Sequence, residues 1–90
     1  MPYKEQVSVI VSLYNPYLDM VYGDRAEESF DSLLDARLIA ETKKAPGKSV
    51  IIRPTYNERD ESGRFFREWR SFNGEDFKEI RWEFSFSEDE

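Results

Sequence analysis

The side chains that could do chemistry in this chain are carboxylates and guanidinium groups, because its 90 residues include no histidine and no cysteine. These absences exclude a Ser-His-Asp triad, imidazole acid–base chemistry, thiolate chemistry, disulfides and the usual structural zinc sites. A carboxylate pair or an activated lysine could catalyse without histidine, but no spacing in the chain places two acids in an apolar pocket. The four glycines stand singly and form no phosphate-binding loop. We therefore expect a protein that is not an enzyme, with no metal site and no cofactor.

A row of carboxylates recurs at helical spacing in the first half of the chain. Its members are Asp24, Glu28, Asp31 and Asp35. On a helix they fall within an arc of about 40°, and neighbours lie about 5–6 Å apart, which is similar to the spacing of phosphates along a nucleic-acid strand. Such a row could bind arginine and lysine side chains, and Ile39 beside it could add an apolar contact. The alternative is a solvated helix face whose acids the helix dipole stabilises.

Arginines are interleaved with aromatic residues between positions 64 and 72. Platforms for single-stranded nucleic acid combine aromatic stacking with neutralisation of phosphates. The candidates for that role are Arg64, Phe66, Arg67 and Phe72. The alternative is an amphipathic strand whose rings build the core. The formal net charge of -6 opposes direct binding to nucleic acid.

Two smaller features complete the set of candidates. Arg37 lies in the middle of a predicted apolar helix stripe. Its side chain could reach the edge of the core, pair with a buried carboxylate or lie in a functional groove, and we favour the first. The acidic loop of residues 57–63 ends at Gly63, as calcium-binding loops place acids before a turn glycine, but Trp69 occupies the position where such loops close with a glutamate. We expect that loop to be a solvated turn.

The elements that must position these residues follow from the pattern of apolar residues. Residues 6–14 alternate apolar and polar side chains and predict a strand. Residues 17–22 fit either a short helix or a returning strand, and their tyrosine and valine content favours the strand. Asp24 to Lys44 is predicted as the helix, with Asp24 as N-cap and Glu27 three residues later. Its predicted buried stripe is Ala26, Phe30, Leu33, Leu34 and Ala40.

Three strands are predicted after the helix, at residues 50–56, 64–72 and 77–87. A four-residue loop between the last two would set Glu68 opposite Arg81 and Arg70 opposite Glu79, which are complementary cross-strand pairs. In that register Phe66, Phe72 and Phe77 lie on the outward face. They would then be either covered by a second layer or exposed to a partner.

These elements predict an α+β fold: a mostly antiparallel sheet of four or five strands with one principal helix packed on one face, in the order β(β)αβββ. Residues 1–90 are expected to form a single small domain, with residues 87–90 as a frayed acidic tail. No apolar run approaches the ~18 residues of a membrane span, and the N-terminus lacks the layout of a signal peptide. We expect a cytoplasmic protein.

Charge is segregated along the chain. Residues 1–41 carry a net charge of -5, residues 42–72 a net charge of +4 and residues 73–90 a net charge of -5. The predicted hairpin neutralises part of its own basic charge, whereas the helix acids lack evident partners. Such a layout favours a partner with a basic, nucleic-acid-binding surface.

We therefore expect a small acidic non-enzymatic binding or inhibitor protein that binds a nucleic-acid-handling protein. By analogy only, small acidic chains without cysteine include many inhibitors encoded by phages or mobile elements, such as anti-CRISPR and anti-restriction proteins, some of which mimic DNA, and no motif here is shared with a specific one. The alternatives are a module that binds single-stranded nucleic acid through the arginine and aromatic run, and an accessory subunit of a larger complex. The partner's identity and the oligomeric state are open at this point.

Overall fold

A computed structural model describes residues 6–54 and 65–83, apart from the side chains of residues 65, 66, 82 and 83. One helix and five strands follow one another along this part of the chain. They are β1 (Val7–Asn15), β2 (Met20–Phe30), α1 (Leu33–Lys43), β3 (Lys48–Pro54), β4 (Phe65–Phe72) and β5 (Lys78–Glu83). The predicted α+β class and the order of elements are confirmed. The predicted loop of residues 57–63, part of each of the three strands predicted after the helix, and the acidic tail lie outside the described residues.

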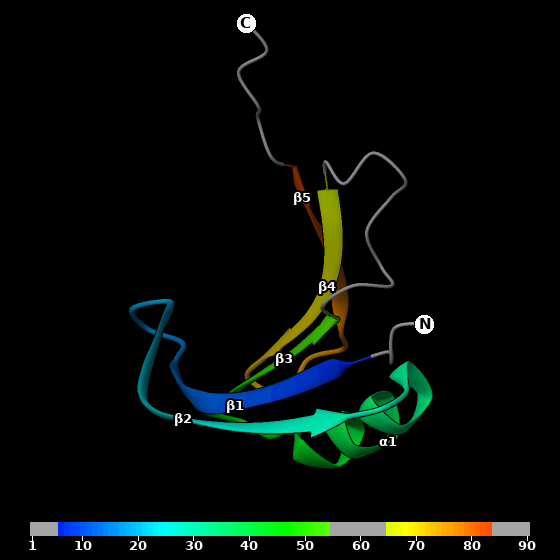
Figure 1. The fold of residues 1–90 in the computed structure, drawn as a ribbon. Helices are drawn as coiled ribbons and strands as arrows, with labels where there is room; N and C mark the ends of the chain where they lie inside the picture. Colours follow the sequence, from blue (N-terminus) through cyan, green and yellow to red (C-terminus); the bar gives the residue numbers. More distant parts are fainter. Residues whose placement is uncertain (1–5, 55–64, 84–90) are drawn as a thin grey trace, which may run out of the picture.

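The five strands form one antiparallel sheet in the order β2-β1-β3-β4-β5. Figure 1 shows that the sheet is strongly twisted, with β4 and β5 running steeply away from β1 and β2, and that α1 lies against one face. The chain passes from β2 through α1 to β3, so the helix crosses over β1. This connection leaves β2 at one edge of the sheet.

The core lies between α1 and the central strands. The predicted alternation of the first strand is confirmed, since Val7 and Val9 are buried on the face toward the helix. The other buried members of this core are Ala36, Ala40, Val50, Ile52 and Trp69. Burial of each Val or Ile side chain contributes roughly 1.5–3 kcal/mol. Small alanines at the contact face of α1 let the helix approach the sheet closely.

The predicted helix is wrong in its first half. Residues 20–30 form β2, which pairs with β1, and the helix begins only at Leu33. Ser32 is the N-cap, because its hydroxyl accepts a hydrogen bond from the Asp35 backbone N–H at 3.0 Å. The local capping pattern at Asp24 fitted a helix equally well, but pairing with β1 satisfies the backbone of this segment instead.

The buried stripe predicted for the long helix changes accordingly. Ala26 is exposed on β2, Phe30 and Leu33 are half-buried against the core, and Ala40 is buried. Leu34 is 68% exposed, so this part of the prediction is wrong. A helix that starts at Leu33 directs Ala36 and Ala40 to the sheet, which turns Leu34 and Leu38 outward.

A bulge interrupts the pairing of β1 with β2. Val11 is paired with Ala26 and Leu13 with Tyr22, so one residue of β1 faces three of β2. Gly23 in this bulge has a φ of 79°, a conformation that other residues rarely adopt. Bulges twist and bend a strand. In Figure 1 the β1–β2 hairpin bends away from the rest of the sheet beyond this region.

The predicted register of the last hairpin is wrong by one residue. Glu68 is paired with Ile80 and Arg70 with Lys78, instead of with Arg81 and Glu79. The connection is five residues long because Phe77 packs against the core and β5 begins only after it. A slip of one residue moves every side chain of a strand to the other face, so the predicted cross-strand ion pairs do not form.

Candidate functional site

Strand β2 stands out because almost nothing described covers it. Ten of its eleven residues are exposed, and Phe30 at its end is half-buried. Its only described neighbour in the sheet is β1, so one long edge carries backbone groups that no described strand pairs with. Such an edge is a template for pairing with another chain.

Carboxylates are concentrated along this edge. Residues 20–35 carry five of them against the single arginine Arg25, and all five are exposed. They are Asp24, Glu27 and Glu28 on β2, Asp31 in the following turn and Asp35 in the first turn of α1. Within the described part of the chain, no ion pair involves any of these five groups.

The predicted geometry of the acidic row is therefore wrong, although its charge is present. Asp24 and Glu28 lie on a strand, Asp31 lies in a turn, and only Asp35 lies on the helix. The regular phosphate-like spacing of a single helix face does not exist here. Ile39 does not flank the row as an exposed anchor either, because it is half-buried beside Ala36 and Ala40.

A groove of about 480 Å³ lies between β2 and the last turn of α1. Its apolar lining comes from Val9 and Val11 of β1 and from Ala26 of β2. Glu27 and Glu28 line it from β2 and Lys43 from α1, so the groove has an acidic side and a basic side. It exists because the helix packs over β1 and β3 and leaves the helix-facing side of β2 open.

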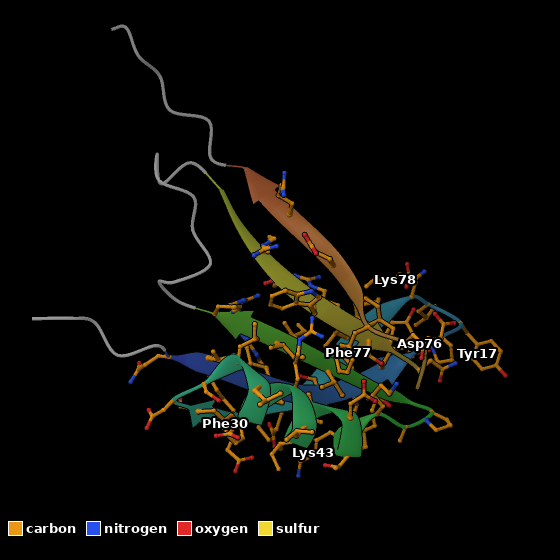
Figure 2. All side chains as sticks on the ribbon, turned by 90° about the vertical axis from the view of Figure 1, so that its right-hand side faces the viewer. Tyr17, Phe30, Lys43, Asp76, Phe77 and Lys78 are labelled. Atoms are coloured by element: carbon orange, nitrogen blue, oxygen red, sulfur yellow. The ribbon has the colours of Figure 1, made fainter. Side chains whose placement is uncertain are left out.

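Large apolar side chains are exposed at the end of the β1–β2 hairpin. They are Leu13, Tyr17, Leu18, Met20, Val21 and Tyr22, and the most exposed is Tyr17 at 95%. Figure 2 shows Tyr17 at the tip of this hairpin, at the end of the sheet far from Phe30. We name these six residues the apolar arm. Sequence reasoning missed it, although the tyrosine and valine content of residues 17–22 marked a strand.

The turn that carries the arm is held by its own side chains. Asn15 Oδ1 accepts hydrogen bonds from the backbone N–H groups of Tyr17 at 2.9 Å and Leu18 at 3.1 Å. The Tyr14 hydroxyl donates a hydrogen bond to Asp19. This hydrogen bond, burial and the negative charges of Asp19 and Glu75 together raise the pKa of Tyr14 above its usual 10.0. The exposed arm is thus presented on an ordered turn.

The alternative nucleic-acid platform is not assembled. Arg64 and the side chain of Phe66 lie outside the described residues. Arg67 shares the helix-facing side of β4 with Trp69, and its Nη1 lies 3.9 Å from Glu79 Oε2. Phe72 lies on the other side of the sheet, half-buried against the ring of Tyr14 with centroids 5.0 Å apart. The two described members therefore lie on opposite faces and cannot bind one strand together.

A buried carboxylate lies on the sheet face that is turned away from the helix. Glu68 is 0% exposed and accepts hydrogen bonds from Arg53 Nε at 2.8 Å and from Arg70 Nε at 2.6 Å. The predicted pairing of Glu68 with Arg81 is wrong, because Glu68 binds Arg53 and Arg70 instead. The three charges link β3 to β4. They stabilise the twisted half of the sheet rather than forming an accessible cation site.

Two other cations contact aromatic rings that pack on the core. The guanidinium of Arg37 lies 4.8 Å from the centre of a Trp69 ring, at the exposed edge of the helix, as the prediction for this long side chain indicated. Lys44 lies 5.6 Å from the centre of the Phe77 ring and also binds Glu41 and Asp76, which raises the pKa of Lys44 above 10.5. Figure 2 labels Asp76 and Phe77 side by side in the turn before β5.

The described residues hold no group of three acidic side chains arranged to bind a metal ion. None of their helices is long and apolar enough to cross a membrane. Comparison of the chain with protein-family models, with curated proteins and with solved structures found no match. The candidate site therefore stands on its own geometry: an open acidic edge strand, the groove beside it and the apolar arm at its end.

Proposed function

We propose that this chain is a cytoplasmic, non-enzymatic binding protein that captures a basic partner on strand β2. The single observation that supports this function is the exposed edge strand with its excess of carboxylates. Residues 20–35 place five acids against one arginine on a surface where none of the five has an ion-pair partner among the described residues. Like charges this close together repel one another, and a basic partner relieves that repulsion.

Proteins that handle nucleic acids are the partner class with the most suitable surface, because they carry lysine and arginine in their binding grooves. By occupying such a groove, the chain would act as an inhibitor, in the manner of anti-CRISPR or anti-restriction proteins. The apolar arm adds uncharged contact area next to the carboxylates, and most of the affinity of protein interfaces resides in such desolvated anchors. Direct binding to nucleic acid is disfavoured by the net charge of -6 and by the separation of Arg67 from Phe72.

The test uses charge reversal at defined places. The probe is a fluorescent synthetic peptide that alternates lysine and valine over eight residues, titrated with the protein at low and at high salt. Glu27→Lys, Glu28→Lys and Asp31→Lys should each weaken binding several-fold at low salt, and high salt should weaken binding to the unmodified protein.

The matched control is Glu75→Lys, which changes the total charge equally but lies in the exposed turn before β5. It should leave the affinity nearly unchanged. If Glu75→Lys weakens binding as much as the three β2 and turn variants do, only the overall charge matters and the proposed site is wrong. If none of the variants changed the affinity, the proposed site would also be wrong.

A further inference from the structure

We propose that the partner segment binds as an added β-strand along the free edge of β2, in an extended conformation with basic side chains on one face and apolar side chains on the other. This inference rests on the proposed function and names the form of its ligand. Three observations support it: the direction of the backbone groups of β2, the groove beside that strand, and the sign of its charges.

The backbone directions follow from the pairing of β1. The Tyr14 N–H donates to the Gly47 carbonyl at 2.9 Å, so Tyr14 points its backbone groups away from β2. In an antiparallel sheet successive residues point to opposite neighbours. Residues 7, 9, 11 and 13 of β1 therefore point toward β2, where their partners are residues 30, 28, 26 and 22.

The residues between those partners point outward. Glu27 and Ser29 lie between Ala26, Glu28 and Phe30, so their N–H and C=O groups face away from β1 along the free edge. Their side chains are also exposed. Strand addition requires alternate residues whose outward donors and acceptors are not paired in the sheet, and no strand in the described part of the chain pairs with those of Glu27 and Ser29.

The groove determines which side chains the added strand carries toward the helix. Its lining includes Val9, Val11 and Ala26, the acids Glu27 and Glu28 of β2, and Lys43 and Lys48. A basic side chain that enters the groove would meet Glu28 beside β2 but also the two lysines, whereas an apolar side chain would contact the valines without placing a third cation beside those lysines. Every second residue of the partner segment, on the helix-facing side, is thus apolar.

The charges of β2 select a basic strand over a second copy of this chain. The strand carries Asp24, Glu27 and Glu28 against Arg25, so pairing two copies edge to edge would bring net negative strands together. Glu27 borders the groove, but its register with Ile10 directs its side chain to the face away from the helix, and lysine or arginine on that face would lie beside it. Opposite charges in neighbouring positions stabilise strand pairs, and like charges destabilise them.

The experiment measures amide hydrogen exchange in the ¹⁵N-labelled full chain, with and without a saturating amount of the lysine–valine peptide. Exchange of the Glu27 and Ser29 amides should slow at least tenfold on binding. Methylation of alternate backbone nitrogens of the peptide on its pairing edge should weaken binding about tenfold at unchanged charge, because backbone hydrogen bonds are lost. Methylation of the other set should leave the affinity nearly unchanged.

A variant of the protein tests the same edge. Ser29→Pro removes an outward N–H without changing charge, and proline is accepted where an edge N–H faces solvent, so it should weaken peptide binding about tenfold. The matched control Ser29→Thr keeps the N–H and should bind normally. If Ser29→Pro does not fold, the exchange measurement on the unmodified chain decides.

The outcomes separate this inference from the proposed function. In one outcome, Glu28→Lys weakens binding, but binding neither protects the Glu27 and Ser29 amides nor responds to peptide methylation. That result overturns strand addition and leaves the proposed function in place. Binding that none of the β2 charge reversals changes overturns the proposed function. Protection of both amides that grows with protein concentration in the absence of peptide shows that a second copy occupies the edge, and it also overturns the inference.

Discussion

Glu68 on β4 and Arg53 on β3 form an ion pair in which the acid is fully buried and the base is not. The two atoms Oε1 and Nε lie 2.8 Å apart, Glu68 is 0% exposed, and the Arg53 side chain is 39% exposed. Arg70, whose side chain is 24% exposed, completes the cluster from the same strand as Glu68. A buried charge depends on its partners, whereas partly exposed guanidinium groups can turn to water.

This difference in burial predicts which of two variants loses more stability. Replacing both arginines, as Arg53→Met and Arg70→Met together, should lower the free energy of unfolding by about 3–5 kcal/mol, because the buried carboxylate loses both guanidinium partners. Glu68→Met should cost less, since both arginines can then be hydrated. Urea denaturation followed by circular dichroism measures both values, with Arg25→Met on the exposed edge strand as control. If Glu68→Met lowers the free energy of unfolding as much as the double arginine variant does, or more, the buried carboxylate does not depend on its partners as predicted.

The start of the helix predicts a different pair of variants. Ser32→Ala removes the hydroxyl that accepts from the Asp35 N–H and should lower the free energy of unfolding by about 1 kcal/mol. Asp24→Ala should have no comparable effect, because Asp24 is exposed on β2. Thermal or urea unfolding of the two variants checks this expectation. A loss confined to Asp24→Ala would instead place the helix start where the local capping pattern predicted it.

The bulge in β2 predicts a glycine effect that depends on a neighbour. Gly23 and Gly47 have φ values of 79° and 77°, so alanine at either position costs about 1–2 kcal/mol of backbone strain. A Cβ at Gly23 would also lie 3.1 Å from Leu13 Cδ1, whereas a Cβ at Gly47 would have no atom within 4 Å. Gly23→Ala should therefore destabilise more than Gly47→Ala in urea unfolding. Introducing Leu13→Ala first should remove that difference, and persistence of the difference would contradict the crowding.

The hydrogen bond between Tyr14 and Asp19 predicts a pH dependence at the alkaline end. It is the largest cause of the raised pKa of Tyr14, relative to a usual value of 10.0. Because the folded chain holds this proton more tightly than the unfolded chain, the contribution is complete below about pH 10 and is lost as pH rises through the raised pKa. Lys44 acts in the same direction from 10.5 upward.

Tyr14→Phe should therefore reduce the loss of stability between about pH 9 and about pH 11. Urea midpoints at these pH values measure it, and tyrosinate absorbance measures the ionisation directly. Tyr17→Phe is the control, because Tyr17 is 95% exposed. If the Tyr14→Phe variant keeps the full dependence, other groups cause it.

Sequence alone predicted the α+β class, the antiparallel sheet and the alternation of residues 6–14, because a period-two pattern is local. It also located the excess of carboxylates between residues 24 and 35. The tertiary structure decided how those carboxylates are presented. Pairing with β1 places residues 24–30, which were predicted as helix, in an edge strand. A helix here would leave the backbone groups along one edge of β1 without a strand partner, and a capping preference of about 1 kcal/mol does not offset that loss.

Packing decided the rest. Phe77 packs against the core and lengthens the last turn, which shifts the register of β4 and β5. The register of β3 and β4 pairs Ile52 with Trp69 and so brings Arg53 beside Glu68, where Arg53 and Arg70 both donate to the carboxylate. Helix α1 is short and packs over β1 and β3, so the groove beside β2 stays open. These features depend on contacts between residues far apart in the chain, so the local spacing of residues does not predict them.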